Sequence, residues 1–137
     1  MIRLNKRGFT LVEIMITVSI ISLLAAIAIP QLITMKRQGN EVLAKSNIRS
    51  LMTGAEIMMA TKGHYPTNFT EFKEFMPTAD TYCWNLTGWP NPYLTNGYIY
   101  TCETNTSGYT FVAYPTTPGS SGNVTYTATS GGVLTPL

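Results

Sequence analysis

The sequence predicts an α+β fold, in which a long N-terminal helix packs against a C-terminal antiparallel β-sheet. An apolar run and then a helical apolar stripe occupy the first half of the chain. Aromatic and β-branched segments separated by Gly, Ser and Asn occupy the last third. The chain has 137 residues, of which 12% are charged. This length predicts one domain with one accessory element and excludes a large multi-domain enzyme.

The first predicted element is an apolar helix from Phe9 to Ile29, whose 21 residues contain a single formal charge, at Glu13. A helix of this length spans about 30 Å, which matches the hydrocarbon core of a bilayer. Arg3, Lys6 and Arg7 precede it, as in a secretory signal peptide. A signal peptide has an apolar region of about 7–15 residues. The greater length and the internal carboxylate therefore favour a membrane-spanning helix.

Glu13 is the most informative residue of this span. A carboxylate inside a bilayer costs about 2.5 kcal/mol or more, so it is normally paired or functional. One alternative is that Glu13, four residues into the span, extends its side chain to the lipid headgroups. Another is an ion pair within the chain, because residues 9 and 13 are spaced i, i+4 on one helix face.

Residues 6–13, Lys-Arg-Gly-Phe-Thr-Leu-Val-Glu, resemble the N-terminus of type IV pilins and of type II secretion pseudopilins, and the resemblance covers Lys6 to about Gln31. It implies that a prepilin peptidase cuts between Gly8 and Phe9 and that the new Phe9 amine is methylated. It also implies that Glu13 of one subunit neutralises the Phe9 amine of a neighbour during assembly. The expected partners are further copies in a helical filament, the peptidase and an inner-membrane assembly platform.

The resemblance divides the chain into four parts. Residues 1–8 would be the leader, 9–29 the transmembrane and assembly helix, 30–63 an amphipathic half of the same helix, and 64–137 a globular β-rich domain. The precursor would cross the bacterial inner membrane once, with its C-terminal domain outside the cytoplasm, before it enters a surface pilus or a periplasmic pseudopilus. Without the leader, six Lys and Arg face seven Asp and Glu. The basic net charge is therefore poor evidence for a nucleic-acid partner.

Pro30 follows the membrane span and should kink or loosen the helix, because it removes a backbone donor. Beyond it, apolar residues recur at spacings of four and three, which predicts an amphipathic helix. Gly63 is the expected terminator. The stripe consists of Ala44, Ile48, Leu51, Ala55 and Met58, and Met52, Met58 and Met59 are expected to pack on it rather than to bind metal.

The remaining elements are short. Asn68 and Glu71 have capping-box spacing, which predicts a helix that ends at Pro77. Segments of strand composition then alternate with turn sequences, which predicts an antiparallel meander of three or four strands laid over the helical stripe. The expected strands are residues 98–102, 109–114, 124–128 and 133–135.

Cys83 and Cys102 are the two cysteines of the chain. Both fall in the part expected outside the cytoplasm, where disulfides persist, so we expect them to form a disulfide. In the chain-entropy model this bond stabilises the fold by about 3 kcal/mol. No His or second Cys pair accompanies them, so a zinc site is not expected.

The sequence predicts no catalytic group, no metal site, no cofactor and no small-molecule substrate. His64 is the sole histidine, and it is expected in a turn after Gly63. Glu41 and Glu56 alternate with the basic residues along the helix, which predicts a solvated face rather than a DNA-binding stripe. These basic residues are Lys36, Arg37, Lys45, Arg49, Lys62 and Lys73.

The stretch from Tyr82 to Tyr93 holds Trp84 and Trp89. It is expected either to form an adhesive or subunit-facing surface or to pack as an irregular loop against the sheet, and packing is favoured.

The predicted function is a structural subunit of a type IV pilus-like filament and not an enzyme. One alternative is a pseudopilin of a type II secretion system. Another is a minor or tip subunit that binds DNA or a surface. Similarity to the major pseudopilins would imply a C-terminal acidic calcium site, but this chain has no Asp or Glu after Glu103. This departure favours the pilin.

Overall fold

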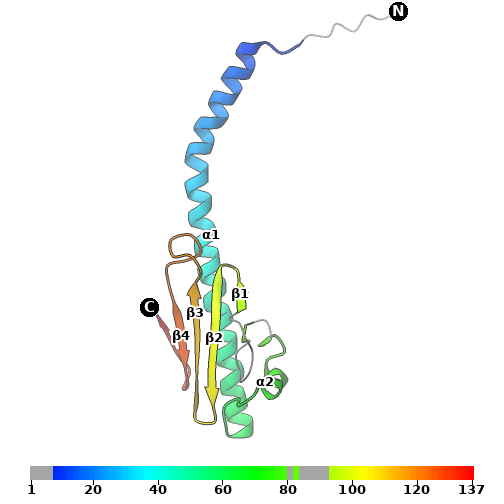
Figure 1. Cartoon of the computed structure of the whole chain (residues 1–137), viewed down its shortest axis with the longest axis vertical. Helices are drawn as coiled ribbons and strands as arrows, with labels where there is room; N and C mark the ends of the chain where they lie inside the picture. Colours follow the sequence, from blue (N-terminus) through cyan, green and yellow to red (C-terminus); the bar gives the residue numbers. More distant parts are fainter. Residues whose placement is uncertain (1–7, 80–81, 84–92) are drawn as a thin grey trace, which may run out of the picture. The chain divides into compact units, whose positions relative to one another are not determined.

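Figure 1 shows a computed structural model of the chain, which describes residues 8–79, 82–83 and 93–137. The chain forms two compact units, Met1–Thr34 and Met35–Leu137. The helix α1 (Leu11–Lys62) contributes to both units and includes Pro30 within its length. It ends one residue before Gly63, as predicted. Gly63 has a φ of 79° and donates its N–H to the carbonyl of Met59, which caps the helix C-terminus.

The second unit contains a five-stranded antiparallel sheet with its strands in chain order (Figure 1). The α+β fold class is therefore confirmed, but the sheet has one strand more than predicted. The additional strand β1 pairs with β2 and has only three residues, too few for a visible alternation of side chains. The strands are β1 (Tyr93–Thr95), β2 (Tyr98–Asn105), β3 (Gly108–Pro115), β4 (Tyr126–Thr129) and β5 (Val133–Pro136).

Two strand boundaries differ from the prediction by more than one residue, each for a physical reason. β2 extends to Asn105 because the polar end of this strand still pairs with β3 down to Gly108. β4 starts at Tyr126 rather than at residue 124. The backbone of Thr125 instead exchanges two hydrogen bonds with Leu137, at 2.9 and 2.7 Å.

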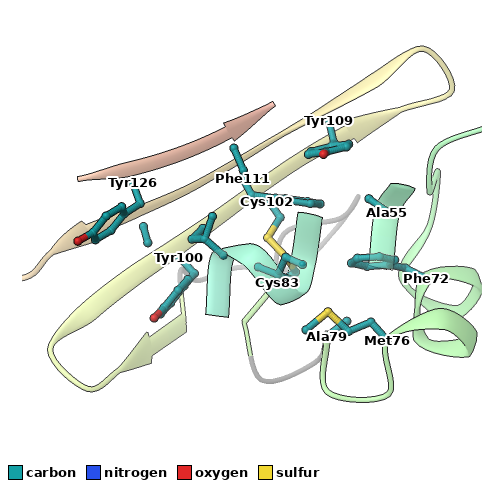
Figure 2. Packing of buried hydrophobic residues seen from close by; sticks show 14 of the residues in the cluster. Ala55, Phe72, Met76, Ala79, Cys83, Tyr100, Cys102, Tyr109, Phe111 and Tyr126 are labelled. Carbon is teal, nitrogen blue, oxygen red and sulfur yellow. A yellow bond between two sulfur atoms is a disulfide. The ribbon is translucent and has the colours of Figure 1, made fainter. Parts of the chain in front are cut away.

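The core of the second unit lies between the sheet and α1. In β2 the buried residues alternate at Tyr98, Tyr100 and Cys102, which places their side chains on one face of the sheet. The predicted stripe of α1 is fully buried on the other side of the core, from Ala44 to Met58. Figure 2 shows the aromatic side chains of this core around the disulfide.

The short helix α2 (Phe69–Phe75) closes one side of the core. Its N-terminus is capped as predicted, because the Asn68 side chain accepts the N–H of Glu71 at 2.9 Å. Gly54 of α1 permits the close approach, since a Cβ there would lie 3.1 Å from the Cβ of Met76 and 3.3 Å from the ring of Phe72.

The methionine prediction is only partly correct. Met58 is buried and Met52 packs against the core, but Met59 is 37% exposed. The tryptophans Trp84 and Trp89 lie outside the described residues.

Candidate functional site

The first candidate site is the segment around Gly8, Phe9 and Glu13 in the first unit. Phe9 precedes α1 and is 85% exposed. A Cβ added at Gly8 would meet nothing within 4 Å. Contacts of the described residues therefore do not require a glycine at position 8.

Thr10 and Glu13 form a reciprocal capping box at the start of α1. The backbone N–H and the hydroxyl of Thr10 each donate to Oε2 of Glu13 at 2.8 Å, and the N–H of Glu13 donates to Oγ1 of Thr10 at 3.2 Å. Glu13 thus has a structural role in its own chain that the analysis of the sequence missed, although the Thr-x-x-Glu spacing was visible. Among the described residues, only Oε2 of its two oxygens has a donor.

The helix that follows is apolar and unburied. One stretch of α1 near the N-terminus is long and apolar enough to cross a membrane, and no part of it is buried inside the molecule. Its large apolar side chains, from Leu11 to Met35, are at least half exposed. An apolar surface of this length, exposed among the described residues, is typical of a segment that contacts lipid or another protein.

The side-chain hydroxyl groups of Thr17, Ser19, Ser22 and Thr34 are satisfied by the helix itself. Hydroxyl groups donate to backbone carbonyls one turn earlier, at 2.7–3.1 Å. In a medium without water every polar group needs an internal partner, so these bonds suit an apolar environment. One of the accepting carbonyls belongs to Pro30, and the donors are Thr17, Ser19, Ser22 and Thr34.

Cys83 and Cys102 form the expected disulfide, with a Cα–Cα distance of 5.4 Å (Figure 2). Both cysteines are at most 1% exposed. The N–H of Cys83 also donates to the carbonyl of Ala79 at 2.8 Å. The bond therefore ties the segment after α2 to the middle of β2, inside the core.

Glu56 is a second residue whose structural role was not predicted from the sequence. Its Oε1 accepts hydrogen bonds from the Tyr109 hydroxyl at 2.8 Å and from the N–H groups of Gly131 and Gly132 at 2.9 and 3.0 Å. Both glycines have positive φ, so the turn between β4 and β5 aims two adjacent amides at one carboxylate. Oε2 accepts the Tyr65 hydroxyl at 3.4 Å.

The environment of Glu56 has an electrostatic effect on Tyr109. Burial raises the pKa of the Tyr109 hydroxyl, and the hydrogen bond to Glu56 and the negative charge of Glu56 raise it further. The tyrosine therefore stays a neutral donor to the carboxylate at physiological pH.

Glu41 makes a similar contact about four turns earlier along α1. Its Oε1 accepts the backbone N–H of Asn123 at 2.8 Å, and the neighbouring Asn40 donates its Nδ2 to the carbonyl of Ser121 at 3.1 Å. The prediction of a solvated face with alternating charges is thus wrong for Glu41 and Glu56. Each carboxylate of this stretch accepts hydrogen bonds from the sheet or its turns, and the sequence signal failed because these partners lie 53 or more residues away.

The cations of the second unit divide into two groups. Lys62 lies 3.0 Å from Glu74 and 3.5 Å from Glu71. His64 follows the helix terminator as predicted, with Nδ1 3.0 Å from the Tyr65 carbonyl and Nε2 3.6 Å from Glu71. By contrast, no hydrogen bond or ion pair within the described part of the chain holds Lys36, Arg37, Lys45 or Arg49.

The described residues contain no cluster of three or more His, Cys, Asp or Glu side chains that could hold a metal ion. The geometry therefore offers two features with chemical consequences. One is an exposed apolar helix that starts at a capped carboxylate, and the other is a folded β unit fastened to the same helix.

The match to a known protein family falls on the exposed apolar helix and the residues before it. The family described as "Prokaryotic N-terminal methylation motif" matches residues 3–29. The chain is 44% identical over 61 residues to the type IV major pilin protein PilA of Myxococcus xanthus, an alignment that covers 44% of this chain and 28% of PilA.

Two further relatives extend the comparison. Similarity to the type II secretion system core protein G of Pseudomonas aeruginosa is 29% identity over 104 residues, which covers 66% of this chain and 73% of the relative. The type IV wide pilus major component PilA4 of Thermus thermophilus is 30% identical over 64 residues, 47% of this chain and 49% of the relative. The chain thus spans between about a quarter and three quarters of the length of these three relatives.

Proposed function

We propose that this chain, whose N-terminal motif and relatives support the type IV pilin and type II secretion pseudopilin family, is a structural subunit of a membrane-anchored helical filament. The observation that carries the proposal is the apolar first half of α1, whose large apolar side chains are at least half exposed in the described part of the chain. In the precursor the bilayer covers this surface, and in the filament the same surface of neighbouring subunits covers it.

Processing prepares the subunit for this exchange. A prepilin peptidase cuts between Gly8 and Phe9, and the Phe9 amine is methylated. Glu13 of one subunit then receives the Phe9 amine of a neighbour, through the oxygen Oε1 that no described residue occupies. Pro30, inside α1, is the expected point at which the helix bends to follow its neighbours.

The alternative is a pseudopilin of a type II secretion system. The alignment with core protein G covers more of this chain than either alignment with a pilus component described above. Against it, the final 34 residues contain no acidic side chain. The pilin therefore remains the first candidate. A role as a minor or tip subunit that binds DNA or a surface is the third.

The test is expression of the full chain in cells that contain a prepilin peptidase and an assembly platform. We expect intact-mass analysis of sheared filaments to give a subunit that starts at a methylated Phe9. A subunit that starts at Met1 or near Ile29, or one that never leaves the membrane fraction, would refute the proposal.

A further inference from the structure

The hydrogen bonds of Glu41 and Glu56 change the charge balance of the second unit. Both carboxylates of the helix stretch from Met35 to Lys62 bond to the sheet unit. Within the described residues, neither carboxylate forms an ion pair with Lys36, Arg37, Lys45 or Arg49 of the same stretch. Lys45 and Arg49 are both exposed and lie one helical turn apart.

Among the described residues, none accepts a hydrogen bond from the Arg49 guanidinium or forms an ion pair with it. Arg49 lies in a shallow groove beside Ser50 and Thr53. These two hydroxyls donate to the carbonyls of Ser46 and Arg49 at 3.1 and 2.8 Å, so they are occupied within the helix. Its neighbour Ile48 is fully buried against the sheet, and Arg49 faces away from it.

The carboxylate that matches this cation lies on the other side of the unit. Glu103 in β2 is exposed, and among the described carboxylates of the second unit it is the one without a hydrogen bond or ion pair. Tyr100 and Cys102, two residues apart in the same strand, are both buried and face α1. The alternation puts Cys102 and Glu103 on opposite faces, so Glu103 lies on the face that points away from α1.

Glu103 also lines a recess of about 460 Å³ with polar walls. Thr110 lies opposite Glu103 in the register, and Thr129 lies opposite Thr110, so these three form one row across the sheet. A carboxylate with hydroxyl groups around it suits a guanidinium, which carries five donors and no acceptor.

We propose that Arg49 of one copy inserts its guanidinium into the Glu103 recess of the next copy. This inference rests on the proposed filament function and names the contact between its globular units. One chain cannot make the contact alone, because Arg49 and Glu103 lie on opposite faces of the same unit. A second copy is favoured over other anions because it supplies a carboxylate in a recess of matching polarity.

The two-sided arrangement determines the kind of assembly. A contact between unlike faces is heterologous, so each copy that uses its Arg49 still offers an open Glu103 recess to another copy. Such contacts do not close at a dimer but continue as a ring or an open helix. The charges thereby give the globular units a direction of growth and a register, in addition to the apolar packing of the helices.

A charge exchange tests the proposal in cells that assemble the wild-type chain. Arg49→Glu and Glu103→Arg each place like charges together, and we expect each to lower the yield of sheared filaments about tenfold or more. The double variant restores opposite charges in exchanged positions, and its yield should return to within about threefold of the wild type. Lys36→Glu is the matched control on the same helix and should change the yield little.

The level of membrane-inserted subunit is measured in parallel, so that a folding defect is separated from an assembly defect. Single variants that assemble normally, or a double variant no better than either single one, would overturn the proposal. The same holds if Arg49→Glu alone abolishes retention of a labelled DNA duplex by the cells while assembly persists, because the cation would then serve a nucleic acid. If the wild-type chain itself forms no filament, the proposed function fails before the contact is tested.

Discussion

Glu56 and Tyr109 are 53 residues apart in the sequence, and Oε1 of Glu56 accepts the hydrogen bond of the Tyr109 hydroxyl at 2.8 Å. The same oxygen holds the amides of Gly131 and Gly132. One carboxylate of α1 therefore joins the helix to β3 and to the turn between β4 and β5. Loss of this carboxylate would leave four donors without their acceptor, because Oε2 also accepts the Tyr65 hydroxyl.

We predict that Glu56→Ala lowers the free energy of unfolding by about 1–3 kcal/mol, because it leaves these donors without their acceptor. Glu56→Gln keeps an acceptor oxygen and should cost less. The measurement is urea unfolding of the full chain in detergent, followed by tyrosine fluorescence. Glu103→Ala is the matched control and should change the free energy by no more than about 0.5 kcal/mol. Equal effects of Glu56→Ala and Glu103→Ala would contradict the prediction.

Tyr98 makes stability depend on pH at the alkaline end. Burial, together with the nearby charge of Glu41, raises the pKa of its hydroxyl to about 12. In the unfolded chain a tyrosine titrates near pH 10. The folded state thus favours the neutral form, and this contribution to stability is complete below about pH 10 and is lost as the pH rises toward 12.

We predict that the urea concentration at the unfolding midpoint decreases as the pH is raised from about 10 to about 12. The decrease should be less steep in Tyr98→Phe. The variant also loses the hydrogen bond from the Tyr98 hydroxyl to the Val124 carbonyl, so its midpoint at pH 7 should already be lower. An unchanged slope in the variant would show that other groups carry the alkaline loss.

The disulfide should stabilise the folded unit rather than support assembly. Its cysteines are separated by 19 residues, for which loop closure predicts about 3 kcal/mol. We expect Cys83→Ala/Cys102→Ala to lower the free energy of unfolding by about this amount. A reductant should destabilise the wild type and leave the double variant unchanged. Two free thiols in peptide maps of exported protein would argue against the bond.

The capping box at the start of α1 provides a control for the role of Glu13. Glu13→Gln removes the charge but keeps an acceptor for the Thr10 N–H, since Gln also serves at this capping position. Thr10→Ala weakens the cap but keeps the charge. If Glu13 pairs with the Phe9 amine of a neighbour, Glu13→Gln should insert normally and lose filaments, whereas Thr10→Ala should assemble. Normal filament yield from Glu13→Gln would reject the intersubunit pair.

Calcium should leave the melting temperature unchanged at about 1 mM. Calcium takes six to eight oxygen ligands and relies on carboxylates, and the strands and turns after Glu103 carry none on their side chains. A clear rise in the melting temperature would instead favour the pseudopilin. Differential scanning calorimetry with and without a chelator is the measurement.

Local patterns predicted the elements of this fold well. The four- and three-residue spacing gave the buried stripe of α1, and the capping residue Asn68 gave the start of α2. The pairing of Cys83 with Cys102 followed from there being two cysteines, both in the part of the chain expected outside the cytoplasm. Each of these depends on residues close in sequence or on a choice without alternatives.

Long-range polar contacts could not be predicted in this way. Glu41 and Glu56 occupy positions that a local charge pattern assigns to solvent, and their partners come from turns near the C-terminus. The row of Glu103, Thr110 and Thr129 exists only once the register of β2, β3 and β4 is fixed. The Thr10–Glu13 capping box is different, because its signal is the local Thr-x-x-Glu spacing, which the sequence shows directly.

The hydroxyl groups along the apolar half of α1 form hydrogen bonds that do not depend on the surrounding medium. Because Thr17, Ser19 and Ser22 already donate to their own helix, exchanging acyl chains for neighbouring helices neither breaks nor creates a hydrogen bond at these positions. The polar contribution to that transfer is then concentrated at a single group, Glu13. In the proposed filament, a subunit passes from lipid to neighbouring helices without a change in hydrogen bonding at these hydroxyl groups, and the proposed pairing of Glu13 supplies the polar contact that favours the filament.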